Sequence, residues 1–127
     1  MSENKIIAVD FDGTCVFNRF PEVGDTIPKC VDVLNKLIKK KHKIILLTMR
    51  SGITLTAAKE WFNKNNIKLY GVNENPNQST WSKSRKVFAH IYIDDNNLGC
   101  PVFHDSSGKK FVNWDQVESL LKHEGVI

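Results

Sequence analysis

Four short apolar runs divide the chain, and none of them alternates regularly with polar residues. They are KIIAVD at 5–10, KIILLT at 43–48, IKLYGV at 67–72 and HIYIDD at 90–95. Continuous apolar strands are typical of a parallel sheet that is covered on both faces, whereas strands with one wet face alternate. The pattern therefore predicts four buried strands in a parallel sheet.

Helical spacing of apolar residues occurs between these runs. Pro28 suits the first turn of a helix that extends to the lysine-rich stretch, and further helices are predicted at about 54–65, 81–88 and 114–123. Residues 11–27 and 73–80 are predicted to be irregular, and 101–105 with 109–114 to form a hairpin. This alternation predicts an α/β fold with helices on both faces of the sheet, in a single domain spanning 1–127.

Composition narrows the class of protein. The chain has 127 residues, of which 41% are hydrophobic, and this suits one globular domain. No apolar run approaches the roughly 20 residues that span a membrane, and the polar start MSENK does not resemble a signal peptide. We therefore expect a cytoplasmic protein without a membrane partner. The three cysteines include no CxxC pair, which argues against a disulfide framework or a zinc site.

The net charge of +4 comes largely from the stretch KLIKKKHK at 36–43. A basic cluster admits nucleic acid as a partner. It is more often the solvated face and last turn of a helix, where cations suit the helix dipole. The charge alone does not decide between these interpretations.

Polar residues stand where the predicted strands end. Asp10 and Asp12 follow the first run, Thr48 ends the second, and Asp94 and Asp95 end the fourth. Parallel strands end at one edge of a sheet, so these side chains are expected to converge there. A single strand-end Asp is often only a cap, but two acidic pairs with a Thr form a set of hard oxygen ligands that suits Mg²⁺. The carboxylates account for such a site without a catalytic thiol from the nearby Cys15.

Three segments resemble the motifs of the haloacid dehalogenase (HAD) superfamily of aspartate-dependent phosphohydrolases. They are VDFDGT at 9–14, LLTMR at 46–50 and KVFAHIYIDD at 86–95. The resemblance implies a Rossmann-like three-layer sandwich, Mg²⁺ as cofactor, and a phosphorylated substrate that is a small molecule or a polymer end. It implies that Asp10 is the nucleophile that forms an aspartyl phosphate, and that Asp12 is the general acid and then the base.

The resemblance also implies which residues hold the phosphoryl group. Thr48 and a lysine would bind its oxygens, and Lys86 is favoured over Lys83 because compact members place a lysine at that distance before the acidic pair. Arg50 and Arg85 are candidate substrate contacts, although each is equally well explained as an exposed surface residue.

The implied metal ligands come from both acidic pairs. They are the carboxylate of Asp10, the backbone carbonyl of Asp12, and Asp94 with Asp95 in support. Metal and lysine together would neutralise the charge of the transferring phosphoryl group.

The two segments in which members of this superfamily carry a cap domain are short here, at 14–27 and 71–83. We therefore expect a capless enzyme with at most a short flap in the first segment. Without a lid, water must be excluded by the substrate, the flap or a second subunit, which admits a homo-oligomer.

The leading hypothesis is thus a Mg²⁺-dependent phosphomonoester hydrolase of unknown substrate. A nucleotide or nucleic-acid-end phosphatase is the alternative within that class. A non-catalytic phosphoacceptor, such as a response-regulator receiver, is disfavoured because the second strand ends in Thr48 without an Asp. A basic binding module without chemistry is disfavoured because the full set of motif residues is present.

Overall fold

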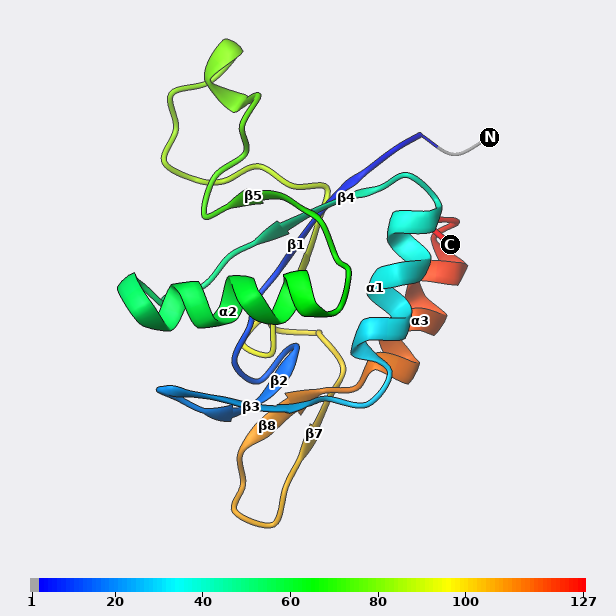
Figure 1. Cartoon of the computed structure of the whole chain (residues 1–127). Coiled ribbons are helices and arrows are strands. Elements are labelled where there is room, and N and C mark those ends of the chain that lie inside the picture. Colours follow the sequence, from blue (N-terminus) through cyan, green and yellow to red (C-terminus); the bar gives the residue numbers. More distant parts are fainter. Residues whose placement is uncertain (1–2) are drawn as a thin grey trace.

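The computed structural model describes residues 3–127, and its centre is a parallel sheet of four strands (Figure 1). The strands are β1 (Ile6–Val9), β4 (Lys43–Leu46), β5 (Leu69–Val72) and β6 (Ile91–Ile93), in the order β5-β4-β1-β6. Each neighbouring pair is parallel. The predicted strands and their parallel pairing are confirmed.

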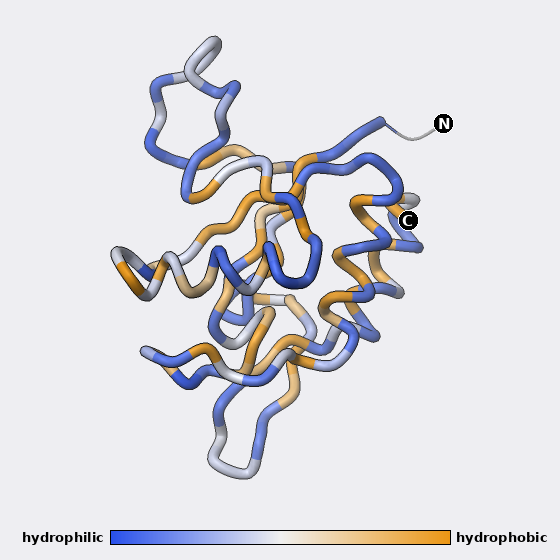
Figure 2. Tube along the Cα trace, viewed as in Figure 1, coloured by the Kyte–Doolittle hydropathy of each residue, from blue (hydrophilic) through white to orange (hydrophobic). Residues whose placement is uncertain are grey.

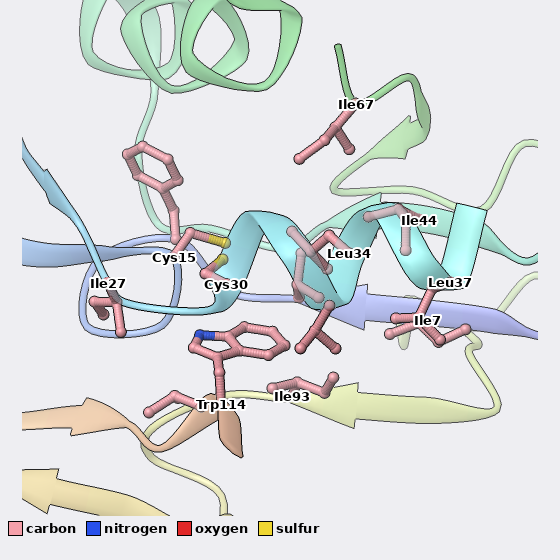
Figure 3. Packing of buried hydrophobic residues seen from close by; sticks show 14 of the residues in the cluster. Ile7, Cys15, Ile27, Cys30, Leu34, Leu37, Ile44, Ile67, Ile93 and Trp114 are labelled. Carbon is pink, nitrogen blue, oxygen red and sulfur yellow. The ribbon is translucent and has the colours of Figure 1, made fainter. Parts of the chain in front are cut away.

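The three α-helices pack on one face of this sheet. They are α1 (Cys30–Lys39), α2 (Gly52–Lys64) and α3 (Trp114–His123). Leu34 of α1, Phe62 of α2 and Val117 of α3 belong to one buried cluster that also contains Ile7 of β1, and Figure 3 shows Leu34 beside this strand. The three helices were predicted at these places, but the prediction of helices on both faces is wrong.

The order of the strands explains this one-sided arrangement. The chain steps from β1 to β4 to β5 in one direction across the sheet and returns from β5 to β6 in the other. Since crossovers are right-handed, opposite steps place their connections on opposite faces. The returning connection, residues 73–90, covers the second face, where Val87 and Ala89 pack with Ala8 and Ile45.

This returning connection contains no α-helix. Its regular part is the single 3₁₀ turn η1 (Gln78–Thr80), so the helix predicted at 81–88 is wrong. Gln78 is only 8% exposed, and its amide nitrogen donates to the carbonyls of Ser84 (3.2 Å) and Lys86 (2.7 Å). Its amide oxygen accepts from the backbone N–H of Phe88 (2.8 Å). One side chain thus satisfies backbone groups that a helix would have paired internally.

We expect Gln78→Leu to destabilise the protein by about 2–4 kcal/mol, because it leaves three backbone groups without their partner. The matched control is Gln116→Leu, at an exposed position of α3. Chemical denaturation of both variants measures the difference in the free energy of unfolding. Equal effects at the two positions would mean that the amide of Gln78 does not organise the connection.

Two antiparallel hairpins complete the fold. The first is β2 (Val16–Arg19) with β3 (Glu22–Thr26), in a segment that was predicted to be irregular, and it occupies the place in which a short flap was expected. The second, β7 (Val102–His104) with β8 (Lys110–Val112), confirms the predicted hairpin. The hairpins touch through Phe17 and Phe111, whose ring centroids are 4.9 Å apart. The two lie side by side in Figure 1.

Figure 2 shows that apolar residues gather between the helices and the sheet, while the tip of the 73–90 connection is mostly hydrophilic. Among residues 3–127, no helix is both long enough and apolar enough to cross a bilayer.

Candidate active site at the carboxyl edge of the sheet

Three carboxylates meet at the carboxyl ends of two adjacent strands. Asp10 follows β1, and Asp94 and Asp95 follow β6. One carboxylate oxygen from each lies within 4.8 Å of the others. The convergence expected from strand-end positions is therefore present for these three residues, and it joins positions more than eighty residues apart because β1 and β6 are neighbours in the sheet.

Thr14 is the residue that sequence reasoning left without a role. Its hydroxyl is fully buried and lies 3.1 Å from Oδ2 of Asp10 and 3.3 Å from Oδ1 of Asp95. It also accepts a hydrogen bond from the backbone N–H of Asp95 (3.2 Å). The carbonyl of Thr14 accepts from Nε1 of Trp114 (2.7 Å), which fixes the loop against α3. Its position as the last residue of the motif VDFDGT is the sequence feature that could have identified Thr14 as part of the site.

Gly13 allows the two acidic segments to approach closely. Its φ is +83°, a left-handed conformation that favours glycine. A Cβ added at this position would stand 2.7 Å from Oδ2 of Asp95. The backbone carbonyl of Gly13 also accepts from Val112 of β8 (3.0 Å), so the second hairpin is anchored to the same loop.

The protein leaves the negative charge of this cluster uncompensated. Within residues 3–127, no lysine or arginine forms an ion pair with Asp10, Asp94 or Asp95. Burial, followed by the charge of Asp94, raises the pKa of Asp10 to about 8. Burial likewise raises the pKa of Asp95. Three carboxylates within 4.8 Å of one another, with no basic partner among the described residues, are a donor set that fits Mg²⁺.

This shift predicts a pH-dependent effect of Mg²⁺ on stability. The pKa of Asp10 is raised from 3.8 to about 8 in the folded protein, so the protonated form of Asp10 contributes to stability. This contribution is fully present below about pH 4 and is lost as the pH rises to about 8. In metal-free protein, the free energy of unfolding should therefore fall over this range. A bound cation favours the ionised form, so MgCl₂ should raise the melting temperature more at pH 8 than at pH 5.

The control for this experiment is Asp10→Asn, which cannot ionise and should flatten most of the difference between the two pH values. Thermal unfolding with and without MgCl₂ measures both proteins. An equal effect of Mg²⁺ at pH 5 and pH 8 in the unmodified protein would contradict the assignment of the cation to this cluster.

The carboxylate of Asp12 lies outside the cluster and is paired with Arg50. Its Oδ2 accepts from Nε and its Oδ1 from Nη2, each at 2.8 Å. This is the bidentate geometry that a guanidinium forms with a carboxylate. The carbonyl of Asp12 as a metal ligand, and its carboxylate as acid and base, stay predictions.

Arg50, predicted as a substrate contact or an exposed residue, is buried, with 3% exposure. Besides Asp12, its Nη1 donates to the carbonyls of Pro21 (3.2 Å) and Thr54 (3.1 Å), and its Nη2 to the carbonyl of Glu22 (2.8 Å). All five N–H groups of the guanidinium are therefore used within the protein. This geometry does not support direct substrate contact by Arg50.

Thr48 lies at the end of β4, where it was expected. Its backbone N–H donates to the side-chain oxygen of Asn73 (2.9 Å), and its hydroxyl oxygen accepts from the backbone N–H of Arg50 (3.1 Å). The hydroxyl proton remains able to donate to a ligand. Asn73 thus joins the site as a support for Thr48 that the sequence did not reveal.

Neither predicted lysine forms an ion pair with the acidic cluster. The ammonium of Lys86 is 5.7 Å from the ring centroid of Tyr92, and Lys83 lines a polar hollow of about 260 Å³ formed by the 73–90 connection. Lys110 of β8 is linked to the cluster indirectly. Its ammonium donates to Oδ1 of Asn96 (2.7 Å), and the backbone N–H of Asn96 donates to Asp94 (2.8 Å). The choice between Lys83 and Lys86 stays a prediction.

Cys15 is fully buried, and its thiol lies 3.3 Å from the carbonyl of Asp10. Burial raises the pKa of this thiol well above its usual value. A nucleophilic cysteine needs an accessible thiolate, so the position of Cys15 argues against a catalytic thiol.

Comparison with known proteins finds a solved structure that is similar to this chain over nearly its full length. No family model matches it, and neither does any curated protein. A conserved protein from Bacteroides thetaiotaomicron has 33% sequence identity and a TM-score of 0.80, over 96% of this chain and 93% of that one. Such identity over nearly the full length of both chains shows common descent as well as a common fold. The chain therefore belongs to the same family as this conserved Bacteroides thetaiotaomicron protein.

Proposed function

We propose that the protein is a Mg²⁺-dependent phosphomonoester hydrolase of the HAD type, which acts through an aspartyl phosphate on Asp10. The observation that carries this proposal is the meeting of Asp10, Asp94 and Asp95 within 4.8 Å at the carboxyl edge of a parallel sheet. Ligands bind at that edge in open parallel sheets. The resemblance of VDFDGT to the nucleophile motif supports the same assignment.

In the proposed first step, the carboxylate of Asp10 attacks phosphorus while the bond from phosphorus to the leaving oxygen breaks. Asp12 gives its proton to that oxygen. In the second step, Asp12 takes a proton from water, whose oxygen attacks the aspartyl phosphate. The bond from phosphorus to Asp10 breaks, and inorganic phosphate leaves.

The remaining residues position the phosphoryl group. The hydroxyl of Thr48 and the ammonium of Lys86 would bind its oxygens. Mg²⁺, held by Asp10, Asp94, Asp95 and the carbonyl of Asp12, would supply neutralisation of the phosphoryl charge.

The fold fits this proposal as a reduced form of the Rossmann-like three-layer sandwich. On that view, the connection 73–90 stands in place of the helices on the second face. The segments in which members of the HAD superfamily carry caps are here the hairpin β2–β3 and this connection, so among residues 3–127 neither segment contains a cap domain.

The test is Mg²⁺-dependent turnover on a panel of phosphomonoesters that includes aryl phosphates, nucleotides and oligonucleotides phosphorylated at the 5′ or 3′ end. We expect hydrolysis that EDTA abolishes, and preference within the panel identifies the substrate class. A phosphoacceptor would retain one phosphate without turnover, and a binding module would show neither. Absence of Mg²⁺-dependent release from every member would overturn the proposal.

Separate Lys83→Ala, Lys86→Ala and Lys110→Ala variants test the phosphate-binding cation. We expect the loss to be largest for Lys86→Ala, on the order of a hundredfold in kcat/KM, because its ammonium would offset the charge of the transferring group. Inhibition by vanadate should weaken in the same variant. A large loss of kcat/KM in Lys110→Ala, together with unchanged kcat/KM in Lys86→Ala, would assign phosphate binding to Lys110 of the second hairpin instead.

A further inference from the structure

Arg50 joins three parts of the structure through one buried guanidinium. It binds the carboxylate of Asp12 in the loop that follows β1. It also donates to the carbonyls of Pro21 and Glu22 at the turn of the first hairpin, and to the carbonyl of Thr54 in α2. The side chain of Arg50 is 1% exposed and that of Asp12 is 17% exposed. No other ion pair in residues 3–127 has both partners this well buried.

Aromatic rings enclose the same guanidinium. Its central carbon lies 5.1 Å from the ring centroid of Phe11 and 5.2 Å from that of Phe20. Phe11 is fully buried in the core, whereas Phe20 is 57% exposed at the hairpin turn. The contact with Phe20 therefore extends from the buried ion pair to the protein surface.

These contacts cannot be broken one at a time without cost. Loss of Asp12 would leave the charged guanidinium of Arg50 buried without its carboxylate partner, which is energetically unfavourable. Movement of the hairpin would remove the carbonyls of Pro21 and Glu22 as acceptors of the same guanidinium. The hairpin turn and the carboxylate of Asp12 therefore share one set of hydrogen bonds, and a change in one changes the stability of the other.

We propose that Arg50 is a positioning residue that couples the hairpin β2–β3 to the carboxylate of Asp12. With the hairpin in place, both oxygens of Asp12 are bound by Arg50; displacement of the turn removes two carbonyl acceptors of the guanidinium and loosens its hold on Asp12. The consequence for catalysis rests on the proposed function, but the coupling itself does not.

Backbone hydrogen exchange over residues 16–26 tests the coupling without any assay of activity. We expect Arg50→Gln and Asp12→Asn each to raise exchange of the hairpin amides on the order of tenfold, because each removes the same anchor. The double variant should exchange no faster than the faster single variant. Additive effects, or unchanged exchange in Asp12→Asn, would overturn the coupling.

Two further variants keep the experiment interpretable. Arg85→Gln removes an exposed arginine from the 73–90 connection and should leave exchange of 16–26 unchanged. Arg50→Lys retains the charge with fewer donors, so it tests the anchor even where Arg50→Gln fails to fold, and an intermediate increase in exchange is expected. Exchange in Arg50→Lys equal to that of the unmodified protein would also overturn the coupling.

Activity then separates this inference from the proposed function. In Arg50→Lys, kcat should change more for a substrate with a poor leaving group than for an aryl phosphate, because only the former depends strongly on protonation by Asp12. Equal changes for both substrates would overturn the catalytic consequence. If the unmodified protein shows no Mg²⁺-dependent turnover while exchange remains coupled, the proposed function fails and the coupling stands.

Discussion

Asp10→Asn is expected to abolish Mg²⁺-dependent hydrolysis of an aryl phosphate, with a loss of at least about 10⁴-fold in kcat. Asn has nearly the shape of Asp but cannot form the aspartyl phosphate, so the covalent route disappears altogether. Steady-state kinetics with excess MgCl₂ measures the loss. The substitution also removes one of the three carboxylates that meet within 4.8 Å.

The fold should survive this change and become more stable in the absence of metal. Burial and the charge of Asp94 disfavour the ionised form of Asp10, and an amide carries no such penalty. The control is Asp25→Asn, at an exposed position of β3. Turnover by Asp10→Asn comparable with that of the control would rule out Asp10 as the nucleophile.

Gly13→Ala is expected to damage both the fold and the site. Alanine must adopt φ +83°, and its Cβ would stand 2.7 Å from Oδ2 and 2.9 Å from Cγ of Asp95. Either the loop or the carboxylate must move, and the carboxylate is part of the acidic cluster. We expect a loss of stability of about 1–3 kcal/mol and a fall in turnover on the order of a hundredfold.

The chain offers a matched control at Gly108 in the β7–β8 turn. Gly108 has a φ of +89°, but no atom lies within 4 Å of the Cβ that alanine would add. Gly108→Ala therefore carries the backbone cost without the collision. Denaturation and kinetics on both variants separate the two effects, and similar turnover in the two would show that Asp95 does not need its present position.

The strands and their polar ends were predictable because each depends on local pattern. A continuous apolar run such as 43–48 predicts a buried strand whatever its neighbours are, and parallel pairing then brings Asp10 and Asp94 to one edge. The failure at 81–88 has a tertiary cause. The backbone there is held by Gln78, and nothing in the spacing of residues shows that this side chain turns inward.

The pairing of Asp12 with Arg50 was unpredictable for a similar reason. The two residues are 38 positions apart, and either one read by itself has another explanation, as a catalytic acid or as a surface cation. Two of the three carbonyls that complete the environment of the guanidinium come from the hairpin, a segment that was predicted to be irregular, and the third comes from Thr54 of α2. A site built from side chains of several elements can be recognised only when the positions of those elements in space are known.

The contacts of Thr14 also determine when the site can form. Its hydroxyl meets Asp95 across 81 positions, and its carbonyl meets Trp114 across 100. On the ribosome, residues 10–14 emerge long before their partners, so the acidic cluster assembles only after most of the chain has been made. Loops of this length are slow to close and carry a large entropic cost, whereas helices form from local contacts. During refolding, helical structure should therefore form no later than the acidic cluster, whose carboxylates come together only when these long-range contacts close.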